Sequence, residues 1–213
     1  MTEDFSRRPI ASRNTKWAAH VTRRLVARGV APNRISAGSV VAAALAGGAF
    51  ATAGAVGALW ATGLLLLLGA AFTQLRLLCN LFDGLVAVEG GMASPDGAFW
   101  NEVPDRLSDL LILAGFGMAS GRLELGLLAG ALAILTAYLR EFGRAAGFGS
   151  DFRGPGAKSH RMAVVTLGAL AQVAGLIAGW GWPILAWALW LVLALTAATV
   201  IRRCLRILRR MRG

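Results

Sequence analysis

The chain is 213 residues long, and 56% of its residues are hydrophobic before its 27 glycines are counted. A soluble domain has about 45–50% apolar residues with glycine included, so this composition excludes an ordinary soluble fold. Only 15% of the residues are charged, yet the formal net charge is +11. The hydrophobic share leaves no room for the basic soluble face of a nucleic-acid-binding protein. An anionic membrane surface is the partner that this charge favours.

The first 33 residues are polar and basic, and they form the first of two predicted units. They lack an apolar stretch followed by a small-residue cleavage site, so we do not expect a signal peptide here. Trp17, Val21 and Leu25 recur every four residues with basic residues on the other face, and Gly29 follows them. This pattern predicts an amphipathic helix that lies in the membrane interface. A solvated basic tail is the alternative.

Residues 34–213 form the second predicted unit, which consists of apolar blocks separated by glycine and proline breaks. Each block can span a bilayer, because roughly 20 helical residues at about 1.5 Å of rise cross about 30 Å of hydrocarbon. Small residues are dense in the first block, which favours close helix packing. We therefore expect an all-α integral membrane protein with six transmembrane helices, over residues 35–55, 58–88, 98–119, 123–147, 161–181 and 184–204.

The basic residues predict the orientation of these spans. All but one of the 22 lysines and arginines fall in the N-terminal unit, around the second and third spans, between the fourth and fifth spans, or at the C-terminus. The exception is Arg122, between the third and fourth spans. By the positive-inside rule, both termini face the cytoplasm. This count assigns Arg76 and Arg106 to the second-to-third connection.

Acidic residues gather at one place in this apolar chain. Six of the eleven fall within 27 positions at the cytoplasmic ends of the second and third spans, namely Asp83, Glu89, Asp96, Glu102, Asp105 and Asp109. Ionisable residues at the edge of membrane spans indicate a functional site, with structural ion pairs as the alternative. Only Arg76 and Arg106 are nearby in sequence to neutralise the six, so a divalent cation is favoured as the counter-charge.

Helical spacing divides the polar residues of this region into two stripes. The second span carries a stripe at i, i+3, i+4 and i+7, made of Asn80, Asp83, Gly84 and Ala87. The third span carries a stripe at i, i+4 and i+8, made of Asn101, Asp105 and Asp109. The two small residues leave space for a ligand. Facing carboxylate and amide oxygens with room for a phosphate suit Mg²⁺ or Mn²⁺.

The spacing resembles the signature of the CDP-alcohol phosphatidyltransferase family, D-x2-D-G-x2-A-R-x8-G-x3-D-x3-D. Every spacing is kept in the matching segment, Asn80-x2-Asp83-Gly84-x2-Ala87-Val88-x8-Gly97-x3-Asn101-x3-Asp105. Asparagine stands at the first and third aspartate positions, and Val88 stands at the arginine position. Six spans with cytoplasmic termini and a preceding amphipathic helix also resemble that family.

The resemblance implies an enzyme of phospholipid biosynthesis. Such an enzyme transfers the phosphatidyl group from CDP-diacylglycerol to an alcohol acceptor and releases CMP. It would be a homodimer in a bacterial inner membrane, with its active site facing the cytoplasm. In the family, the four aspartates hold two divalent cations over the pyrophosphate, and the last aspartate deprotonates the acceptor hydroxyl.

Carried over to this chain, the resemblance makes Asp105 the catalytic base. The metal ligands are then Asn80, Asp83, Asn101 and Asp105. An asparagine offers an oxygen without a charge, so either one ion suffices, or Asp109 or Glu102 makes up the deficit. The nucleotide and pyrophosphate would lie against Asn33, Ser36, Gly84, Ala87 and Gly97.

Basic residues at the end of the fourth span and the start of the fifth are candidate ligands of the acceptor: Arg140, Arg144, Lys158 and Arg161. The rigid fork of arginine suits phosphate, so the acceptor could be phosphorylated, as are glycerol 3-phosphate and inositol phosphate. The alternative is that these side chains anchor the helices by snorkelling to lipid headgroups.

Three other functions are alternatives to phosphatidyl transfer. A degenerate relative that binds lipid or a partner without turnover is consistent with the two asparagines and Val88. An intramembrane prenyltransferase is disfavoured because a second aspartate-rich motif is absent from the sequence. A transporter is disfavoured because the acidic residues gather at one membrane face and do not follow a path across it.

Overall fold

The structure is a computed structural model, and it describes residues 15–213. Regular structure in that range is entirely helical, and Arg7, Arg8 and Arg13 of the predicted basic segment lie outside it. The helices are α1 (Lys16–Ala27), α2 (Pro32–Ala55), α3 (Leu59–Glu89), α4 (Gly97–Ala119), α5 (Leu123–Ala145), α6 (Lys158–Ile177) and α7 (Ile184–Met211).

Helices α2 to α7 correspond one by one to the six apolar blocks of the sequence. The largest differences are at the C-terminal ends of the last two helices. Helix α6 stops at Ile177, four residues early, and Gly179 follows with a positive φ of 70°. Helix α7 continues to Met211, seven residues beyond its predicted end, because the arginine-rich segment after the apolar block stays helical.

Five of the helices are long and apolar enough to cross a membrane: α2, α3, α5, α6 and α7. Helix α4 has sufficient length, but Glu102, Asp105, Arg106 and Asp109 lie between its start and its middle turn and make that part strongly polar. An all-helical, multi-pass membrane protein is therefore supported. The sixth span and the cytoplasmic orientation stay predictions.

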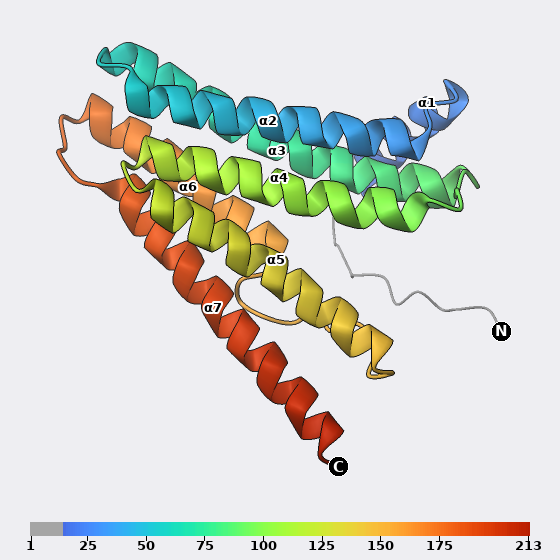
Figure 1. The fold of residues 1–213 in the computed structure, drawn as a ribbon. Helices are drawn as coiled ribbons and strands as arrows, with labels where there is room; N and C mark the ends of the chain where they lie inside the picture. Colours follow the sequence, from blue (N-terminus) through green and yellow to red (C-terminus); the bar gives the residue numbers. More distant parts are fainter. Residues whose placement is uncertain (1–14) are drawn as a thin grey trace.

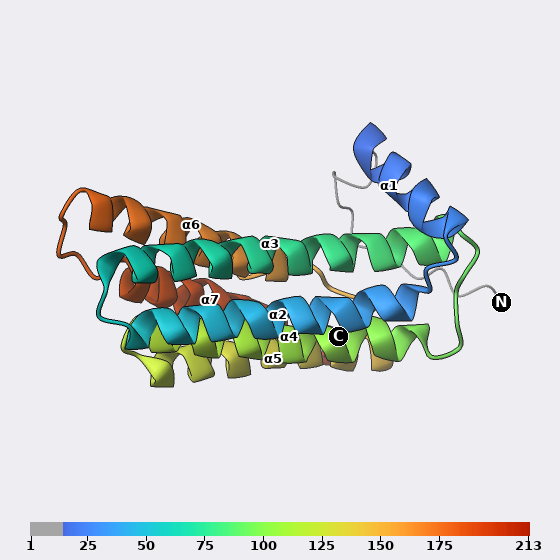
Figure 2. The same ribbon diagram turned by 90° about the horizontal axis from the view of Figure 1, so that it is seen from above.

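Small residues let the helices approach closely. Helix α2 packs against both α3 and α4, while α5 contacts α4 and α7 (Figures 1 and 2). A Cβ atom built on Gly115 of α4 would lie only 2.1 Å from the carbonyl oxygen of Gly47 in α2. Close by, the rings of Phe50 and Phe116 meet edge to face at 5.2 Å between centroids. The dense small residues of the first block thus serve helix packing, as predicted.

Helix α1 lies across the end of α3, apart from the main bundle (Figure 2). Ala18 is fully buried, and the ring of Trp17 meets that of Phe82 edge to face at 5.7 Å. After the helix, Gly29 adopts a positive φ of 65°. The predicted helix is present, and part of its apolar face covers α3. Its placement in a membrane interface stays a prediction.

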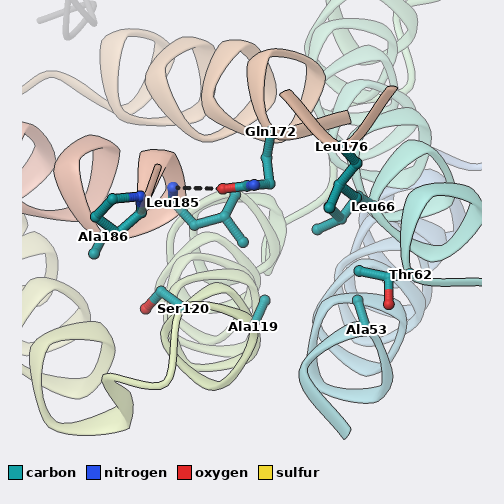
Figure 3. Close-up of a pocket in the computed structure, with 10 residues that line it drawn as sticks. Ala53, Thr62, Leu66, Ala119, Ser120, Gln172, Leu176, Leu185 and Ala186 are labelled. Atoms are coloured by element: carbon teal, nitrogen blue, oxygen red, sulfur yellow. Dashed lines mark hydrogen bonds between the residues drawn. The ribbon is translucent and has the colours of Figure 1, made fainter. Parts of the chain in front are cut away.

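The two ends of the bundle differ in character. Helix α1, the end of α3 and the start of α4 lie at one end (Figures 1 and 2). The opposite end holds a cavity of about 220 Å³ between the α2–α3 side and the α6–α7 side (Figure 3). Its lining is mainly apolar, with Thr62, Ser120 and Gln172 as its polar members. The charged residues gather at the first end, which makes it the location of the candidate site.

Candidate active site

Arg76 joins α3 to α4 in the interior of the protein. Its side chain is fully buried, and its Nη2 atom lies 3.1 Å from Asp105 Oδ1 and 3.0 Å from Asp109 Oδ1. The same nitrogen also donates to the backbone carbonyl of Asp105 at 3.2 Å. Buried carboxylates require such partners, because an unpaired charge in the interior is costly. Arg76 therefore fixes the stripe of acidic residues on α4.

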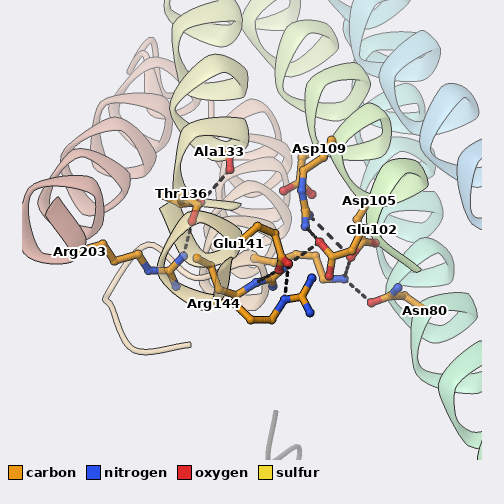
Figure 4. Close-up of polar contacts among 12 residues, drawn as sticks. Asn80, Glu102, Asp105, Asp109, Ala133, Thr136, Glu141, Arg144 and Arg203 are labelled. Carbon is orange, nitrogen blue, oxygen red and sulfur yellow. Dashed lines mark hydrogen bonds and ion pairs between the residues drawn. The ribbon is translucent and has the colours of Figure 1, made fainter. Parts of the chain in front are cut away.

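The first turn of α6 brings two more cations to the same carboxylates, Asp105 and Asp109, which are labelled in Figure 4. Lys158 Nζ contacts both Asp105 Oδ2 and the side-chain oxygen of Asn80. Arg161 Nη2 contacts Asp109 Oδ2, and its Nη1 donates to the carbonyl of Gly156 at 2.5 Å. Asn80 on α3 and Asp105 on α4 thus converge on one ammonium group, as the two predicted stripes require.

Asp83 lies one turn after Asn80 and is also buried. Its Oδ2 accepts a hydrogen bond of 2.8 Å from the hydroxyl of Ser36 on α2. Its Oδ1 is buried without a hydrogen-bond partner among the residues that the structure describes. A buried carboxylate oxygen of this kind is suited to accept a cation. Asp83 is therefore the residue of the predicted set best placed to bind a metal ion.

Asn33 forms a separate polar contact at the edge of this region. Its side-chain nitrogen lies 3.2 Å from each carboxylate oxygen of Asp96 and 3.3 Å from Ser94 Oγ. The indole nitrogen of Trp100 donates to Asp96 as well, at 2.9 Å. Hydrogen bonds from Ser94, Trp100 and Asn33 hold the pKa of Asp96 below its usual value. Asn33 thus ties the start of α2 to the α3–α4 connection.

The remaining predicted nucleotide and metal residues lie on α3 and on the first turns of α4. Gly84, Ala87 and Gly97 are half-buried, and a Cβ atom on Gly97 would meet only Ser94 Oγ, at 3.5 Å. The absence of a side chain at Gly97 is therefore not needed for packing within the described chain. Asn101 is exposed in the first turns of α4, one turn before Asp105.

Arg140 and Arg144 take part in a second ion-pair network nearer the surface (Figure 4). Arg140 contacts Glu102 across the α4–α5 interface, and its Nε lies 3.0 Å from Glu141 Oε1. Arg144 Nε lies 2.8 Å from Glu141 Oε2, and about half of its side chain is exposed. Glu102 also contacts Arg106 in its own helix. Arg144 is the more accessible of the two predicted phosphate ligands.

The acidic cluster has more basic partners than the residues nearby in sequence indicate. Arg76 and Arg106 are the two that sequence proximity predicts, and Arg76, expected in a connection, is buried inside α3. Lys158 and Arg161 were expected at the acceptor, and their contacts are with Asp105 and Asp109. Structural ion pairs, the alternative interpretation of the acidic cluster, are therefore present. A signal for Arg76 was present, because it is the only charged residue between positions 59 and 82.

This arrangement is a buried, polar helix-bundle site at one end of a multi-pass membrane fold. No protein-family model matches the sequence, and no curated protein matches it. Solved structures with the same fold were found. The phosphatidylinositol phosphate synthase PgsA1 of Mycobacterium tuberculosis with CDP-DAG bound has a TM-score of 0.73, at 20% identity over 91% of this chain and 94% of that chain.

Two further structures of PgsA1 have the same fold. The complex with manganese and citrate has a TM-score of 0.72, at 20% identity over 89% of this chain and 88% of that chain. The apo form has a TM-score of 0.66, at 21% identity over 87% of this chain and 93% of that chain. At such identities the likeness establishes the fold, and the chemistry has to be argued from the residues of this chain.

Proposed function

We propose that the chain is a CDP-alcohol phosphatidyltransferase. In this proposal it transfers a phosphatidyl group from CDP-diacylglycerol to an alcohol acceptor, with release of CMP, in the course of phospholipid biosynthesis. One observation carries the proposal: residues of the spaced motif on α3 and α4, Asn80 and Asp105, converge on Lys158 at one end of the bundle. The shared fold with a structure that has CDP-DAG bound supports it.

Asp83 is the donor that fits a divalent cation such as Mg²⁺ or Mn²⁺; residues 15–213 hold no cluster of three or more histidine, cysteine, aspartate or glutamate side chains arranged for a metal ion. The carboxylate oxygen Oδ1 of Asp83 is buried and has no partner in the described part of the chain, whereas Arg76 and Lys158 engage the two oxygens of Asp105. Hard oxygen ligands of this kind are those that both ions prefer. When bound, the ion supplies positive charge that stabilises the phosphates during the reaction. The manganese complex of PgsA1 supports this assignment.

Asp105 is the proposed base. The acceptor oxygen attacks the lipid-proximal phosphorus of CDP-diacylglycerol, the bond from that phosphorus to the bridging oxygen breaks, and CMP leaves with the bond's electrons. The hydroxyl proton passes to a carboxylate oxygen of Asp105. Arg76 keeps this carboxylate oriented through its contacts with the side chain and the backbone carbonyl. Ser36 orients Asp83 in the same way.

The other predicted ligands complete the proposal. Asn33, Gly84, Ala87 and Gly97 bind the nucleotide and pyrophosphate, with the small residues admitting the substrate between α3 and α4. Arg140 and Arg144 bind a phosphorylated acceptor, and Lys158 and Arg161 form the inner side of that site. The exposed guanidinium of Arg144 supports its assignment to an incoming anion.

CMP release tests the proposal directly. The purified protein is given CDP-diacylglycerol, Mg²⁺ or Mn²⁺ and a panel of alcohols, including glycerol 3-phosphate and inositol phosphate. We expect CMP with at least one acceptor, and its loss in Asp83→Asn and Asp105→Asn. Glu124→Gln, which changes an exposed carboxylate outside the site, is the matched control. Full activity in both aspartate variants would refute the proposal.

A second candidate is binding without turnover. It is favoured by the pairing of Asp105 with Arg76 and Lys158, which opposes protonation of the carboxylate, and by the asparagine at position 80. The two functions differ in one measurement. A protein that only binds would retain radiolabelled CDP-diacylglycerol on a filter and would release no CMP with any acceptor.

We also propose that the protein is a homodimer in a bacterial inner membrane, with the site facing the cytoplasm. Orientation is testable with single cysteines in a chain whose two free cysteines, Cys79 and Cys204, are replaced by serine. In spheroplasts, a membrane-impermeant maleimide should label Glu124→Cys and spare Glu89→Cys. The reverse pattern would invert the topology. Chemical cross-linking in the membrane tests the dimer.

A further inference from the structure

Lys158 occupies an unusual position for a lysine in a membrane protein. It is the first residue of α6, and its ammonium group lies between Asn80 of α3 and Asp105 of α4. Only 18% of the side chain is exposed. The contact with Asp105 is an ion pair, and the contact with Asn80 uses the amide oxygen as a neutral acceptor. A fixed positive charge therefore links the two stripes.

Two acidic residues, Asp109 and Glu102, could replace the negative charge that is missing at the asparagine positions, but both already form ion pairs. Asp109 is held by Arg76 on one oxygen and by Arg161 on the other, and 1% of its side chain is exposed. Glu102 contacts both Arg106 and Arg140. Neither carboxylate is free to serve as a metal ligand without breaking an ion pair. The deficit at position 80 is therefore not made up by another acid.

The charges of the buried cluster are balanced before any ion binds. Asp83, Asp105 and Asp109 carry three negative charges, while Arg76, Lys158 and Arg161 carry three positive ones. One divalent ion would leave the cluster at a net charge of +2, which the pyrophosphate of the substrate can offset. Two ions would leave it at +4 in a low-dielectric region, where uncompensated charge is strongly unfavourable.

We propose that the site takes a single divalent cation, at Asp83, and that the Lys158 ammonium takes the place of a second ion on the Asn80–Asp105 side. This rests on the proposed function, because the pyrophosphate supplies the charge that balances the ion. It differs from the two-ion arrangement that the family resemblance implies. It also gives Lys158 a role as a positioning residue for Asp105, beside its place at the inner side of the acceptor site.

The number of bound ions tests this inference. Bound Mn²⁺ is counted per chain by electron paramagnetic resonance on detergent-purified protein, with CDP present as the pyrophosphate probe. We expect one ion in the natural chain and one in Asn80→Asp, because Lys158 pairs with the new carboxylate. The double variant Asn80→Asp/Lys158→Met should bind two. Two ions or none in the natural chain, or one in the double variant, would overturn the inference.

A second measurement does not depend on the folding of a variant. The sequence contains two lysines, Lys16 and Lys158, so protein labelled with ¹³C at lysine Cε gives two signals. The exposed Lys16, identified by Lys16→Arg, is the reference. On adding Mg²⁺ and CDP, the Lys158 signal should stay distinct from that of Lys16. A shift to the position of Lys16 would show that the ion displaces the ammonium, and would overturn the inference.

The outcomes are separable from those of the CMP assay. A protein that releases CMP and binds two Mn²⁺ ions keeps the proposed function and loses the single-ion site. A protein that binds one Mn²⁺ and yields no CMP with any acceptor loses the proposed transferase activity, while the ion count remains as inferred.

Discussion

The two ends of the bundle are held together by different forces. At the end that carries the site, α3, α4 and α6 are joined by ion pairs centred on Arg76, Lys158 and Arg161. Toward the other end, α2 and α4 touch through their backbones, where Gly47 meets Gly115. An added atom destabilises a closely packed helix interface, whereas an unpaired charge destabilises a buried ion-pair network. The difference implies that the two regions fail in different ways when altered.

The strongest test of the charged end is Arg76→Met. This change leaves Asp105 and Asp109 each without one of its cations in the protein interior. Breaking a buried pair by removing one partner costs about 3–5 kcal/mol, so we expect a loss of that order in the free energy of unfolding. Thermal or SDS unfolding in detergent measures it.

Arg122→Met is the control for Arg76→Met, because 62% of the Arg122 side chain is exposed. It should leave the unfolding transition nearly unchanged. If Arg76→Met and Arg122→Met both unfold at the same temperature as the natural protein, the ion pairs do not stabilise the charged end. The proposed difference between the two ends is then wrong.

The tightly packed end is tested by Gly115→Ala. The new methyl group would lie 2.1 Å from the carbonyl oxygen of Gly47, so α2 and α4 have to separate. Overpacking of this kind costs about 1–3 kcal/mol, and we expect a value near the upper end. Gly48→Ala is matched to it, since a Cβ atom there meets no atom within 4 Å. Equal transition temperatures for the two variants would contradict the packing argument.

The surface network is tested by its effect on substrate binding. If Arg144 contacts a phosphorylated acceptor, Arg144→Ala removes a charge-assisted hydrogen bond of about 1.5–3 kcal/mol. The KM for that acceptor should rise about tenfold or more, since about 1.4 kcal/mol corresponds to a factor of ten. Arg153→Ala, at a position with 70% of its side chain exposed, is the control. An equal rise in KM with an uncharged acceptor would contradict the assignment.

Sequence reasoning predicted the helices well because each apolar block is bounded by glycine or proline. The starts of α3 and α5 were predicted within one residue. The small residues of α2 correctly indicated close packing, since that property depends on size alone. The end of α7 was missed because hydropathy falls at the first arginines, while the helix continues through them.

Ion-pair partners within the candidate site were much harder to predict. Asn80, Asp83 and Asp105 follow from spacing along two helices, and the structure brings Asn80 and Asp105 to one ammonium group. The pairing of Lys158 with Asp105 joins residues 53 positions apart, so no local pattern reports it. Arg161 and Asp109 are similarly distant in sequence. Such contacts depend on how α6 packs against α3, which the sequence pattern does not determine.

The smallest expected effect concerns Asp151, in the α5–α6 connection, whose side chain contacts Arg206 of α7. Burial would raise the pKa of Asp151, but hydrogen bonds from the Arg153 backbone and from Arg206 outweigh it and hold the pKa below 3.8. A lowered pKa means that the contact stabilises the fold above pH 3.8 and is lost as the pH falls through the folded-state value.

This contact at a partly exposed position should contribute less than about 1 kcal/mol. Hydrogen exchange in the last turns of α7, compared between pH 7 and pH 3, measures it. In the natural chain, acid should lower the protection factors there, which correct for the slower intrinsic exchange at low pH, and Asp151→Asn should show the lower protection at both pH values. Glu124→Gln, far from α7's end, should change neither. A full acid response in Asp151→Asn would mean that another carboxylate holds α7, and would extend the charged network beyond the site itself.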